Sequence, residues 1–287
     1  MTPAALLRQM ASRFHQAGIP DPETDSSLLL SFLCGTPPLF LRLDTETELD
    51  ESILRSYQRL AARRMTREPL QYIIGEVAFC GLSIHVDPRV LIPRPETALL
   101  CEWALEKLKS FSAPNVLDLC CGSGCIGLVI ASERPDSSVT LSDCSPDALA
   151  VAGENAARLH LSVAFDQSDL AADLPQRSFD MILSNPPYIP TGACRTLQPE
   201  VKKEPAIALD GGADGLDFYR RIVLKSHVLL KPGGLLLMEL GEGEAAAVSH
   251  LMESAGFSLI EIRKDLNRID RMIYGCNAVP EEVCSIS

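Results

Sequence analysis

A short segment flanking two prolines has residue types that could hold a polar group in a fixed orientation. It reads Ser184-Asn185-Pro186-Pro187-Tyr188 and follows an apolar, strand-like stretch. The two prolines stiffen the backbone because each fixes its own φ angle. Asn185 brings a hydrogen-bond acceptor and a donor to the same place, and Tyr188 adds an aromatic ring. An ordinary proline-rich loop would need neither side chain, so we expect a functional site here.

A glycine-containing segment, Asp118-Leu119-Cys120-Cys121-Gly122-Ser123-Gly124, is the second candidate. Glycines let a ligand approach the backbone, and the helix expected to follow offers unpaired N–H groups. Close packing of strand on helix would also explain the glycines. Asp143, about 20 residues further on, favours the ligand, because a carboxylate there can accept hydrogen bonds from both ribose hydroxyls of an adenosine cofactor.

The segment also separates two classes of adenosine cofactor. It lacks the G-x-G-x-x-G spacing that binds a pyrophosphate. Asp118 would face a phosphate unfavourably but suits a ligand that carries an ammonium and a sulfonium. Together with the strand count given below, this favours S-adenosylmethionine (AdoMet), bound by Asp118, the segment Cys120–Gly124 and Asp143.

The elements that position these residues follow from the pattern after Pro114, where strands and helices alternate. This predicts an α/β fold, a mostly parallel Rossmann-like sheet covered on both faces. Functional segments after its strands would meet at the carboxyl edge, where such sheets bind ligands. The seven expected strands are 116–119, 139–141, 161–165, 179–183, 234–240, 257–262 and 271–276.

The first 75 residues have a different pattern, typical of helices. Apolar residues recur at three- and four-residue steps from Leu6 to Ala17, which predicts one helix with an apolar stripe. A second helix should start at Pro22, with Leu28, Leu29, Phe32 and Leu33 as its apolar residues, and Pro37-Pro38 should break the pattern. A third helix should run from about residue 49. Its arginines, Arg55, Arg59, Arg63, Arg64 and Arg67, are expected on a solvated face, with a partner-docking face as the alternative.

The division of the chain follows from these patterns. We expect a helical domain over residues 1–75, a β-hairpin linker over 76–95 and the cofactor-binding domain over 96–287. The net charge of −12 argues against direct binding of nucleic acid, because phosphate neutralisation needs a basic face. No apolar stretch is long enough to cross a membrane, and no secretory signal is evident, so a cytoplasmic protein is expected. The ten cysteines lack CxxC pairs and nearby histidines; reduced thiols rather than a metal site are expected.

Several segments together carry a resemblance to one family. Asn185-Pro186-Pro187-Tyr188 resembles the motif of methyltransferases that modify a planar nitrogen. With the segments below, the chain resembles the release-factor glutamine methyltransferases, the HemK-type family, over nearly its whole length. These segments are Gln71-Tyr72-Ile73-Ile74-Gly75, Phe79-Cys80-Gly81-Leu82, Leu91-Ile92-Pro93-Arg94-Pro95-Glu96-Thr97, Glu204-Pro205 and Ala208 through Tyr219.

The resemblance implies a function. It implies an AdoMet-dependent protein-(glutamine-N5) methyltransferase acting on the glutamine of the Gly-Gly-Gln motif in peptide-chain release factors, with a substrate-binding helical domain. Asn185, Pro186, Pro187 and Tyr188 would bind the glutamine, and Asn185, Pro186 and Tyr188 would serve catalysis. The resemblance also implies cofactor contacts by Asp169, Leu170 and Asn185. Cys120 stands where the family usually has glycine, and Leu170 where it often has an aromatic residue, which bears on cofactor affinity.

Two other functions are compatible with the same segments. In an adenine-N6 methyltransferase, Asn185 to Tyr188 would hold a flipped base, but the acidic charge and the absence of an evident target-recognition domain oppose this. A non-catalytic AdoMet-binding module would not need an intact Asn185 to Tyr188. His85, Glu204 and Asp214 receive no role from the sequence, and buried structural contacts are expected for them.

Overall fold

The computed structural model describes residues 1–172 and 174–278. Asp173 and residues 279–287, the end of the predicted cofactor-binding domain, lie outside the described residues. The chain divides into two compact units. Unit 1 comprises Met1–Glu76 together with Gln198–Lys203, and unit 2 comprises Val77–Leu197 together with Glu204–Ser287. Sequence analysis placed residues 198–203 with the cofactor-binding domain, whereas the structure groups them with the helical unit.

Unit 1 is built from helices. Prolines start three of them at the first helical position, where a missing N–H costs nothing. The expected break at Pro37-Pro38 is present, because α2 ends at Cys34 and Pro38 begins a separate short helix that the sequence analysis did not predict. The elements are α1 (Pro3–Gln16), α2 (Pro22–Cys34), α3 (Pro38–Leu43), α4 (Glu51–Met65), α5 (Leu70–Ile74) and the 3-10 turn η1 (Val201–Lys203).

The buried faces of unit 1 differ in two ways from the sequence expectation. In α2 the core residues are Leu29 and Leu30, while Leu28 and Phe32 are exposed. In α4 the guanidinium of Arg64 is buried, with only 4% of the residue exposed, rather than on a solvated face. A row of arginines at helical spacing does not reveal which of them meets a carboxylate brought by another segment. Here the carboxylates come from Asp25 and Glu200.

Unit 2 contains a small hairpin and a large sheet. The hairpin consists of β1 (Glu76–Phe79) and β2 (Leu82–His85). The sheet has the order β5-β4-β3-β6-β7-β9-β8. Its first five strands in that order are parallel, and β9 runs antiparallel to both of its neighbours. Its strands are β3 (Asn115–Leu119), β4 (Ser138–Asp143), β5 (Ala164–Gln167), β6 (Phe179–Ser184), β7 (Leu230–Glu239), β8 (Phe257–Lys264) and β9 (Asp270–Asn277).

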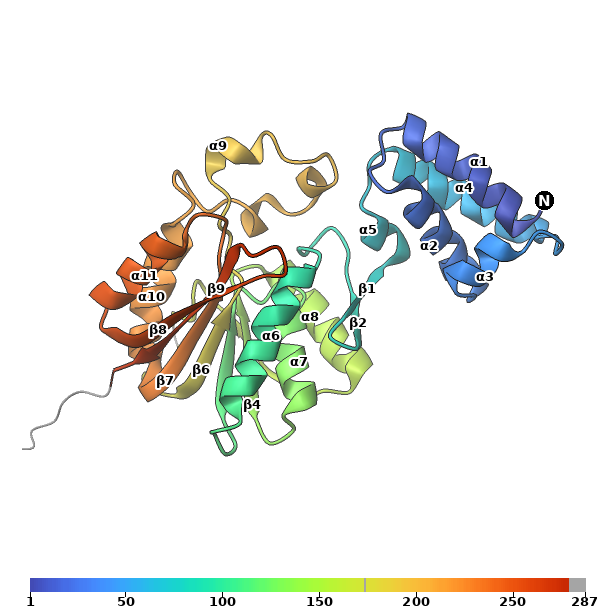
Figure 1. Cartoon of the computed structure of the whole chain (residues 1–287). Coiled ribbons are helices and arrows are strands. Elements are labelled where there is room, and N and C mark those ends of the chain that lie inside the picture. Colours follow the sequence, from blue (N-terminus) through green and yellow to red (C-terminus); the bar gives the residue numbers. More distant parts are fainter. Residues whose placement is uncertain (173, 279–287) are drawn as a thin grey trace, which may run out of the picture. The chain divides into compact units, whose positions relative to one another are not determined.

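Helices cover both faces of this sheet (Figure 1). One face carries α6 (Pro95–Leu108), α7 (Cys125–Glu133) and α8 (Pro146–Leu159), and the other carries α10 (Asp217–Leu229) and α11 (Ala245–Ser254). The segment between β6 and α10 contains three short elements, α9 (Thr191–Cys194), η1 and η2 (Ala206–Ala208). The predicted seven-stranded, mostly parallel α/β sheet is confirmed.

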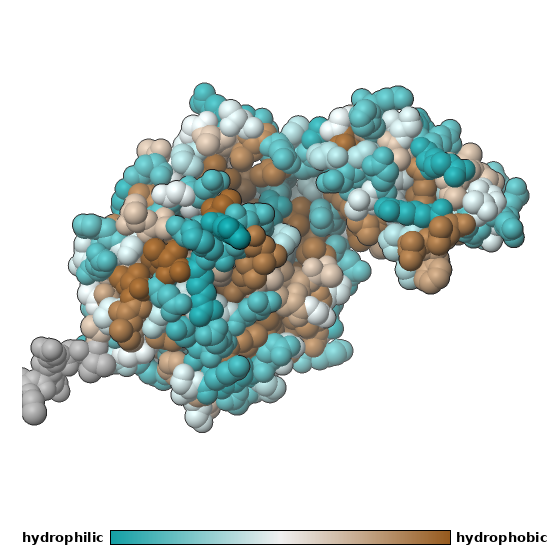
Figure 2. All heavy atoms as spheres, viewed as in Figure 1, coloured by the Kyte–Doolittle hydropathy of each residue, from teal (hydrophilic) through white to brown (hydrophobic). Residues whose placement is uncertain are grey.

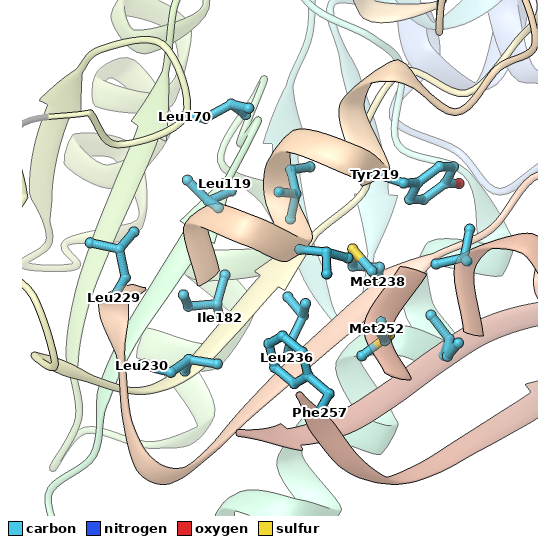
Figure 3. Packing of buried hydrophobic residues seen from close by; sticks show 14 of the residues in the cluster. Leu119, Leu170, Ile182, Tyr219, Leu229, Leu230, Leu236, Met238, Met252 and Phe257 are labelled. Atoms are coloured by element: carbon cyan, nitrogen blue, oxygen red, sulfur yellow. The ribbon is translucent and has the colours of Figure 1, made fainter. Parts of the chain in front are cut away.

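The core between the sheet and its second helical layer is continuous. Side chains from β3, β6 and β7 meet side chains from α10 and α11, as Figure 3 shows for Leu119, Ile182, Leu236, Tyr219 and Met252. Each of these five residues is fully buried. Burying such a side chain contributes about 1.5–3 kcal/mol relative to exposure. The strand ends that carry the predicted site are therefore fixed from below by a rigid core.

The element bounds differ from the expectation mainly at two strands. The third strand begins at Ala164 rather than Leu161, and the fifth begins at Leu230 rather than Gly234. In the fifth strand, Leu230 pairs with Phe179 across a register irregularity, so the Pro232-Gly233 segment lies within the strand. Among the described residues, no helix has both the length and the apolar character needed to span a membrane.

Candidate active site

The glycine-containing segment forms the turn from β3 to α7. Gly122 and Gly124 have φ angles of 54° and 78°, a region that favours glycine. A Cβ on Gly124 would lie 3.0 Å from the Leu141 side chain. The Cys121 N–H donates to the Ser142 carbonyl on β4 over 3.1 Å, which ties the turn to the neighbouring strand.

Asp143, at the end of β4, is attached to this turn. Its Oδ2 accepts a hydrogen bond from the Gly122 N–H (2.9 Å), and its Oδ1 accepts one from the Ser145 N–H (2.9 Å). The N-cap of α8 is Ser145, whose hydroxyl accepts from the Ala148 N–H. Since each carboxylate oxygen has further acceptor capacity, Asp143 can still bind a ligand's hydroxyl groups.

A cavity of about 320 Å³ lies against this turn. Of the residues predicted for the cofactor or the substrate, Cys120, Gly122, Asp143, Asn185 and Pro187 line it. The others, Asp118, Cys121, Ser123, Gly124, Asp169, Leu170, Pro186 and Tyr188, are not among its lining residues. The sequence analysis missed further lining residues, namely Pro88, Arg89, Val90, Leu91, Cys144, Ser145, Asp147, Ala148, Pro205, Ile207, Ala208 and Phe218.

A sequence signal existed for some of the missed residues. Leu91 opens the Leu-Ile-Pro-Arg-Pro segment, and Pro205, Ala208 and Phe218 fall within the segments that carry the family resemblance. Nothing in their spacing placed them near Asp143. Their apolar side chains nonetheless make the cavity suitable for a flat, partly apolar ligand such as a nucleoside.

Asp118 lies in the interior, on β3. It is fully buried, and its Oδ2 accepts the Gly127 N–H in the first turn of α7 (2.8 Å). Burial, helped by the nearby charge of Asp143, raises the pKa of Asp118 to about 7 despite the hydrogen bond from the Gly127 N–H. Its Oδ1 has no hydrogen-bond partner among the described residues. A buried carboxylate with an open acceptor fits a cationic ligand better than a phosphate.

Asp169 and Leu170, after β5, are in different environments. Asp169 pairs with Arg221, and its side chain is exposed. Leu170 is buried in the core cluster of unit 2. Neither forms part of the cavity wall described above, so their cofactor role stays a prediction.

Cys120 adopts a backbone conformation that favours glycine, with a φ of 58°. A side chain in this left-handed region destabilises the folded state by about 1–2 kcal/mol. Replacing it with glycine removes that strain, but the greater freedom of glycine stabilises the unfolded chain by about 0.4–1 kcal/mol. We therefore expect Cys120→Gly to raise the free energy of unfolding by up to about 1 kcal/mol, measured by urea denaturation. Cys121→Gly is the matched control. Cys121 is buried and lacks a positive φ, so its loss should destabilise; equal destabilisation by both variants would refute strain at Cys120.

The Asn-Pro-Pro-Tyr segment follows β6 at the same sheet edge. The Ser184 hydroxyl donates to the Leu119 carbonyl on β3 over 2.8 Å, which anchors the end of the strand. The Asn185 Nδ2 donates to the Thr97 hydroxyl at 3.1 Å. The Tyr188 hydroxyl donates to the Glu239 carboxylate at 3.3 Å. Burial and the nearby Glu239 raise the pKa of Tyr188, so its phenol is neutral and can donate.

The segment after Tyr188 is braced by residues 209–215. Ile189 donates to the Leu209 carbonyl (2.9 Å) and accepts from the Gly211 N–H (2.8 Å). A Cβ on Gly211 would lie 2.7 Å from the Tyr188 Cα, so only glycine fits there. These contacts fix the backbone next to Tyr188. They explain the Asp-Gly-Gly segment, to which the sequence alone assigned no role.

The three residues without an assigned role make different contacts. Glu204 is buried, as expected; it accepts hydrogen bonds from the Ile92 N–H at 3.0 Å and from Arg94 at 2.5 Å. This pairing holds the Ile-Pro-Arg-Pro segment in place. Asp214 pairs with Arg220, but its side chain is half exposed, so the expectation of burial is wrong there.

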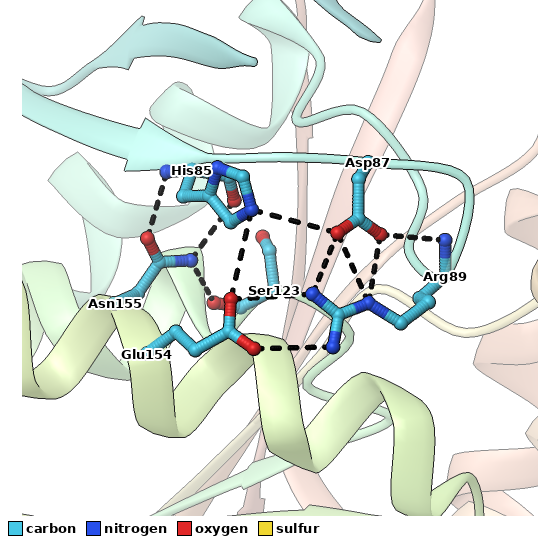
Figure 4. Close-up of polar contacts among 6 residues, drawn as sticks. All are labelled: His85, Asp87, Arg89, Ser123, Glu154 and Asn155. Atoms are coloured by element: carbon cyan, nitrogen blue, oxygen red, sulfur yellow. Dashed lines mark hydrogen bonds and ion pairs between the residues drawn. The ribbon is translucent and has the colours of Figure 1, made fainter.

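His85 belongs to a polar network beside the cavity (Figure 4). Its imidazole lies 3.5 Å from Asp87 and 3.6 Å from Glu154, and Arg89 contacts the same two carboxylates. The Asn155 side chain, on α8, accepts a hydrogen bond from the backbone N–H of His85 at 2.7 Å. It donates to the backbone carbonyls of His85 and Ser123, both at 3.0 Å. The fully buried Asn155 thus joins β2 to the glycine-containing turn.

Comparisons with known proteins agree with this architecture. The sequence profile of the methyltransferase small domain matches residues 97–199, and that of the PrmC N-terminal domain matches residues 5–75. A solved methyltransferase structure from Pyrococcus furiosus superposes with a TM-score of 0.52 at 17% identity, covering 79% of this chain and 99% of that one. This likeness shows the methyltransferase fold.

Curated relatives are similar over most of their length. The release factor glutamine methyltransferase of Clostridium acetobutylicum is 43% identical over 254 residues, which cover 87% of this chain and 89% of the relative. The protein of the same name from Geobacter sulfurreducens is 42% identical over 261 residues, 91% of each chain. The chain therefore belongs to the family of release factor glutamine methyltransferases.

Proposed function

We propose that this protein transfers a methyl group from AdoMet to the side-chain amide nitrogen of the glutamine in the Gly-Gly-Gln motif of peptide-chain release factors. The observation that carries the proposal is the position of Asn185, whose amide is held by Thr97 beside a cavity that also has Asp143 on its wall. Family membership supports the choice of glutamine and of release factors. Nine free cysteines among the described residues are compatible with a reducing compartment such as the cytoplasm.

The residues of the cavity fit AdoMet. Asp143 has acceptor capacity for two ribose hydroxyls. Gly122 has no side chain, so a ligand can approach the backbone of the turn there. Apolar residues such as Leu91 and Phe218 can cover the adenine ring. When bound, AdoMet supplies an electrophilic methyl group on a sulfonium.

The reaction requires a glutamine amide nitrogen to act as a nucleophile, although its lone pair is delocalised into the carbonyl. The Asn185 side-chain carbonyl and the Pro186 backbone carbonyl can each accept one of the two N–H bonds of this amide. Two acceptors favour localisation of the lone pair and stabilise the positive charge that develops on nitrogen. Correct alignment can contribute up to about 7–11 kcal/mol. Tyr188 can pack against the flat amide.

No strong general base is needed in this scheme, because a methylated amide that carries a positive charge loses its proton readily to water. The neutral phenol of Tyr188 therefore acts in packing rather than in proton abstraction.

The activity can be tested with AdoMet carrying a labelled methyl group. Intact release factor should take up the label, and a release factor with Gln→Ala in its Gly-Gly-Gln motif should not. A ribosomal protein and duplex DNA are included as alternative substrates. Label on adenine, or equal label on the Gln→Ala protein, would contradict the proposal.

We further propose that unit 1 docks the folded substrate. A single glutamine carries little information for recognition, so a wider surface is needed. Unit 1 presents an apolar surface formed by Leu28 and Phe32 of α2 and Leu39, Phe40 and Leu43 of α3, which we name the α2–α3 surface. Figure 2 shows apolar residues gathered over these two helices. Phe40 and Leu43 are 63% and 69% exposed, and contiguous exposed apolar groups of this kind mark interaction sites.

The double variant Phe40→Ser/Leu43→Ser tests this surface. Because apolar anchors of an interface each contribute about 1–3 kcal/mol, we expect the KM for intact release factor to rise about tenfold or more. The rate on a short Gly-Gly-Gln peptide and the affinity for AdoMet should not change. Leu266→Ser, at a residue of unit 2 that is 90% exposed, is the matched control. An unchanged KM for the double variant would exclude the α2–α3 surface from docking.

A further inference from the structure

Glu239 is a buried carboxylate that the proposed mechanism does not use. It ends β7, and only 1% of the residue is exposed. Burial raises the pKa of Glu239, while the hydrogen bond from Thr97, the positive charge of Arg271 and the hydrogen bond from Tyr188 counteract that effect. A buried carboxylate is costly unless its partners stabilise it, so its two hydroxyl partners are part of the reason that it is tolerated.

Thr97, at the start of α6, connects this carboxylate to the Asn-Pro-Pro-Tyr segment. Its hydroxyl lies 2.6 Å from Glu239 Oε2 and 3.1 Å from Asn185 Nδ2. Thr97 is 1% exposed, so water does not compete for these contacts. The hydroxyl is the only polar group of the threonine side chain, and both contacts converge on it.

The direction of each hydrogen bond follows from the chemistry of the groups. Glu239 accepts through both carboxyl oxygens, from Thr97 at Oε2 and from Tyr188 at Oε1, so the Thr97 hydroxyl gives its single proton to Glu239. The Thr97 oxygen is then left with lone pairs alone and accepts from the Asn185 NH2 group. The hydrogen bond to Thr97 engages the Nδ2 end of the amide, which leaves Oδ1 for another partner, and Asn185 lines the cavity.

We propose that Glu239 and Thr97 are positioning residues that fix the orientation of the Asn185 amide, so that its carbonyl oxygen rather than its NH2 group is presented to the substrate. This inference rests on the proposed role of Asn185. An amide rotated by 180° would point N–H groups at the N–H groups of the substrate glutamine, and the acceptor would be lost. Since the two ends of an asparagine amide have nearly the same shape, packing alone cannot select one of them.

The same carboxylate also holds the second functional side chain. Its other oxygen, Oε1, accepts from the Tyr188 hydroxyl. One buried group on β7 thereby fixes the orientations of both Asn185 and Tyr188.

The test compares variants of Thr97. Thr97→Val keeps the shape of the side chain but removes the hydroxyl. We expect kcat on release factor to fall about 10- to 100-fold, the scale for losing an outer partner that orients a functional side chain. The KM for release factor and the Kd for AdoMet should stay within about threefold. Thr97→Ser restores the hydroxyl and should restore kcat to within about threefold. If the valine variant fails to fold, Thr97→Ala removes the same hydroxyl.

Tyr219→Phe is the matched control. The fully buried Tyr219 donates to the backbone carbonyl of Glu239 over 3.0 Å, so this variant also loses a buried hydroxyl bound to Glu239. The hydrogen bonds of the Tyr219 hydroxyl are to the backbone of Glu239 and Gly241 and do not involve Thr97 or Asn185. We expect a lower melting temperature with kcat within about twofold of the original.

A double-mutant cycle decides whether Thr97 acts through Asn185. If it does, adding Thr97→Val to Asn185→Ala should lower kcat by no more than about twofold beyond Asn185→Ala alone. Full additivity, or a normal kcat for Thr97→Val with Asn185→Ala inactive, would overturn the positioning role and leave the proposed function intact. A normal kcat for Asn185→Ala would instead refute the proposed role of Asn185 itself.

Discussion

Replacing Asn185 with alanine is expected to lower kcat on release factor about 100-fold or more, since removing one oriented electrostatic contact in an acyl-transfer enzyme costs about 10²–10³. The physical reason is that the Asn185 carbonyl faces a nitrogen that becomes positive only as the methyl group is transferred. An interaction that strengthens in the transition state changes kcat rather than binding. The measurement is the rate of label transfer at saturating substrate, with calorimetry for AdoMet. The Kd for AdoMet should stay within about threefold.

Asn115→Ala provides a control of the same size. Asn115 begins β3, at the end of the strand opposite to the cavity, and its amide donates to the Ser178 carbonyl at 3.1 Å. The loss of this hydrogen bond should lower the free energy of unfolding and leave kcat unchanged. Turnover of Asn185→Ala within about threefold of the original would exclude a catalytic contact by this side chain.

The sheet and the position of the candidate site were predictable because both follow from short-range patterns. Apolar strand segments alternate with helical ones, and this alternation implies parallel strands whose carboxyl ends share one edge. Gly122, Asp143 and Asn185 each come just after a predicted strand, so the topology alone brings them together. The structure places all three on the wall of one cavity.

The contacts that orient these residues could not be predicted in the same way. Thr97 and Glu239 lie far from Asn185 in sequence. Thr97 belongs to a segment that carries the family resemblance, but nothing in that segment indicates a contact with Asn185, and Glu239 has no distinguishing sequence feature. Their connection depends on which way three side chains point after the sheet has formed. Cys120 is a similar case, because its positive φ is a property of the folded turn.

For Arg64 the helix was predicted correctly, but the exposure of the side chain was not. Its position on α4 suggested a solvated face together with the other arginines of that helix. Residues 198–203 return to unit 1 and bring Glu200, which accepts from Arg64 at 2.9 Å and from Arg67 at 2.6 and 2.5 Å. No local pattern marks a carboxylate that arrives from so distant a segment.

Arg64→Ala is expected to destabilise unit 1 by about 3–5 kcal/mol, the cost of removing one partner from a buried ion pair. Arg64 also donates to Asp25 at 2.7 Å and to the Glu68 carbonyl at 3.1 Å. Without it, the buried Asp25 loses its cation, and Glu200 keeps only Arg67. Hydrogen exchange of the amides in α2 and α4 measures the change directly in unit 1. Arg55→Ala, whose exposed pair with Glu51 contributes about 0–1 kcal/mol, is the control.

The pH dependence gives an independent check on the same variant. Burial raises the pKa of Glu200, but the hydrogen bonds from Arg67 and Arg64 outweigh it and lower that pKa to about 2. A carboxylate with a lowered pKa stabilises the folded state above its unfolded pKa of about 4.3, and this contribution is lost as the pH falls toward 2. Part of the difference between the original protein and Arg64→Ala should therefore disappear between about pH 4.5 and pH 2. The pKa of Asp25 is shifted in the opposite direction, because burial raises it despite Arg64. In the variant, the charged Asp25 is buried without its cation, so protonation of Asp25 at low pH makes the variant relatively more stable. Acid should therefore reduce the difference in stability between the original protein and Arg64→Ala through both carboxylates. A difference in stability that stays constant down to pH 2 would show that Arg64 stabilises unit 1 through packing rather than charge.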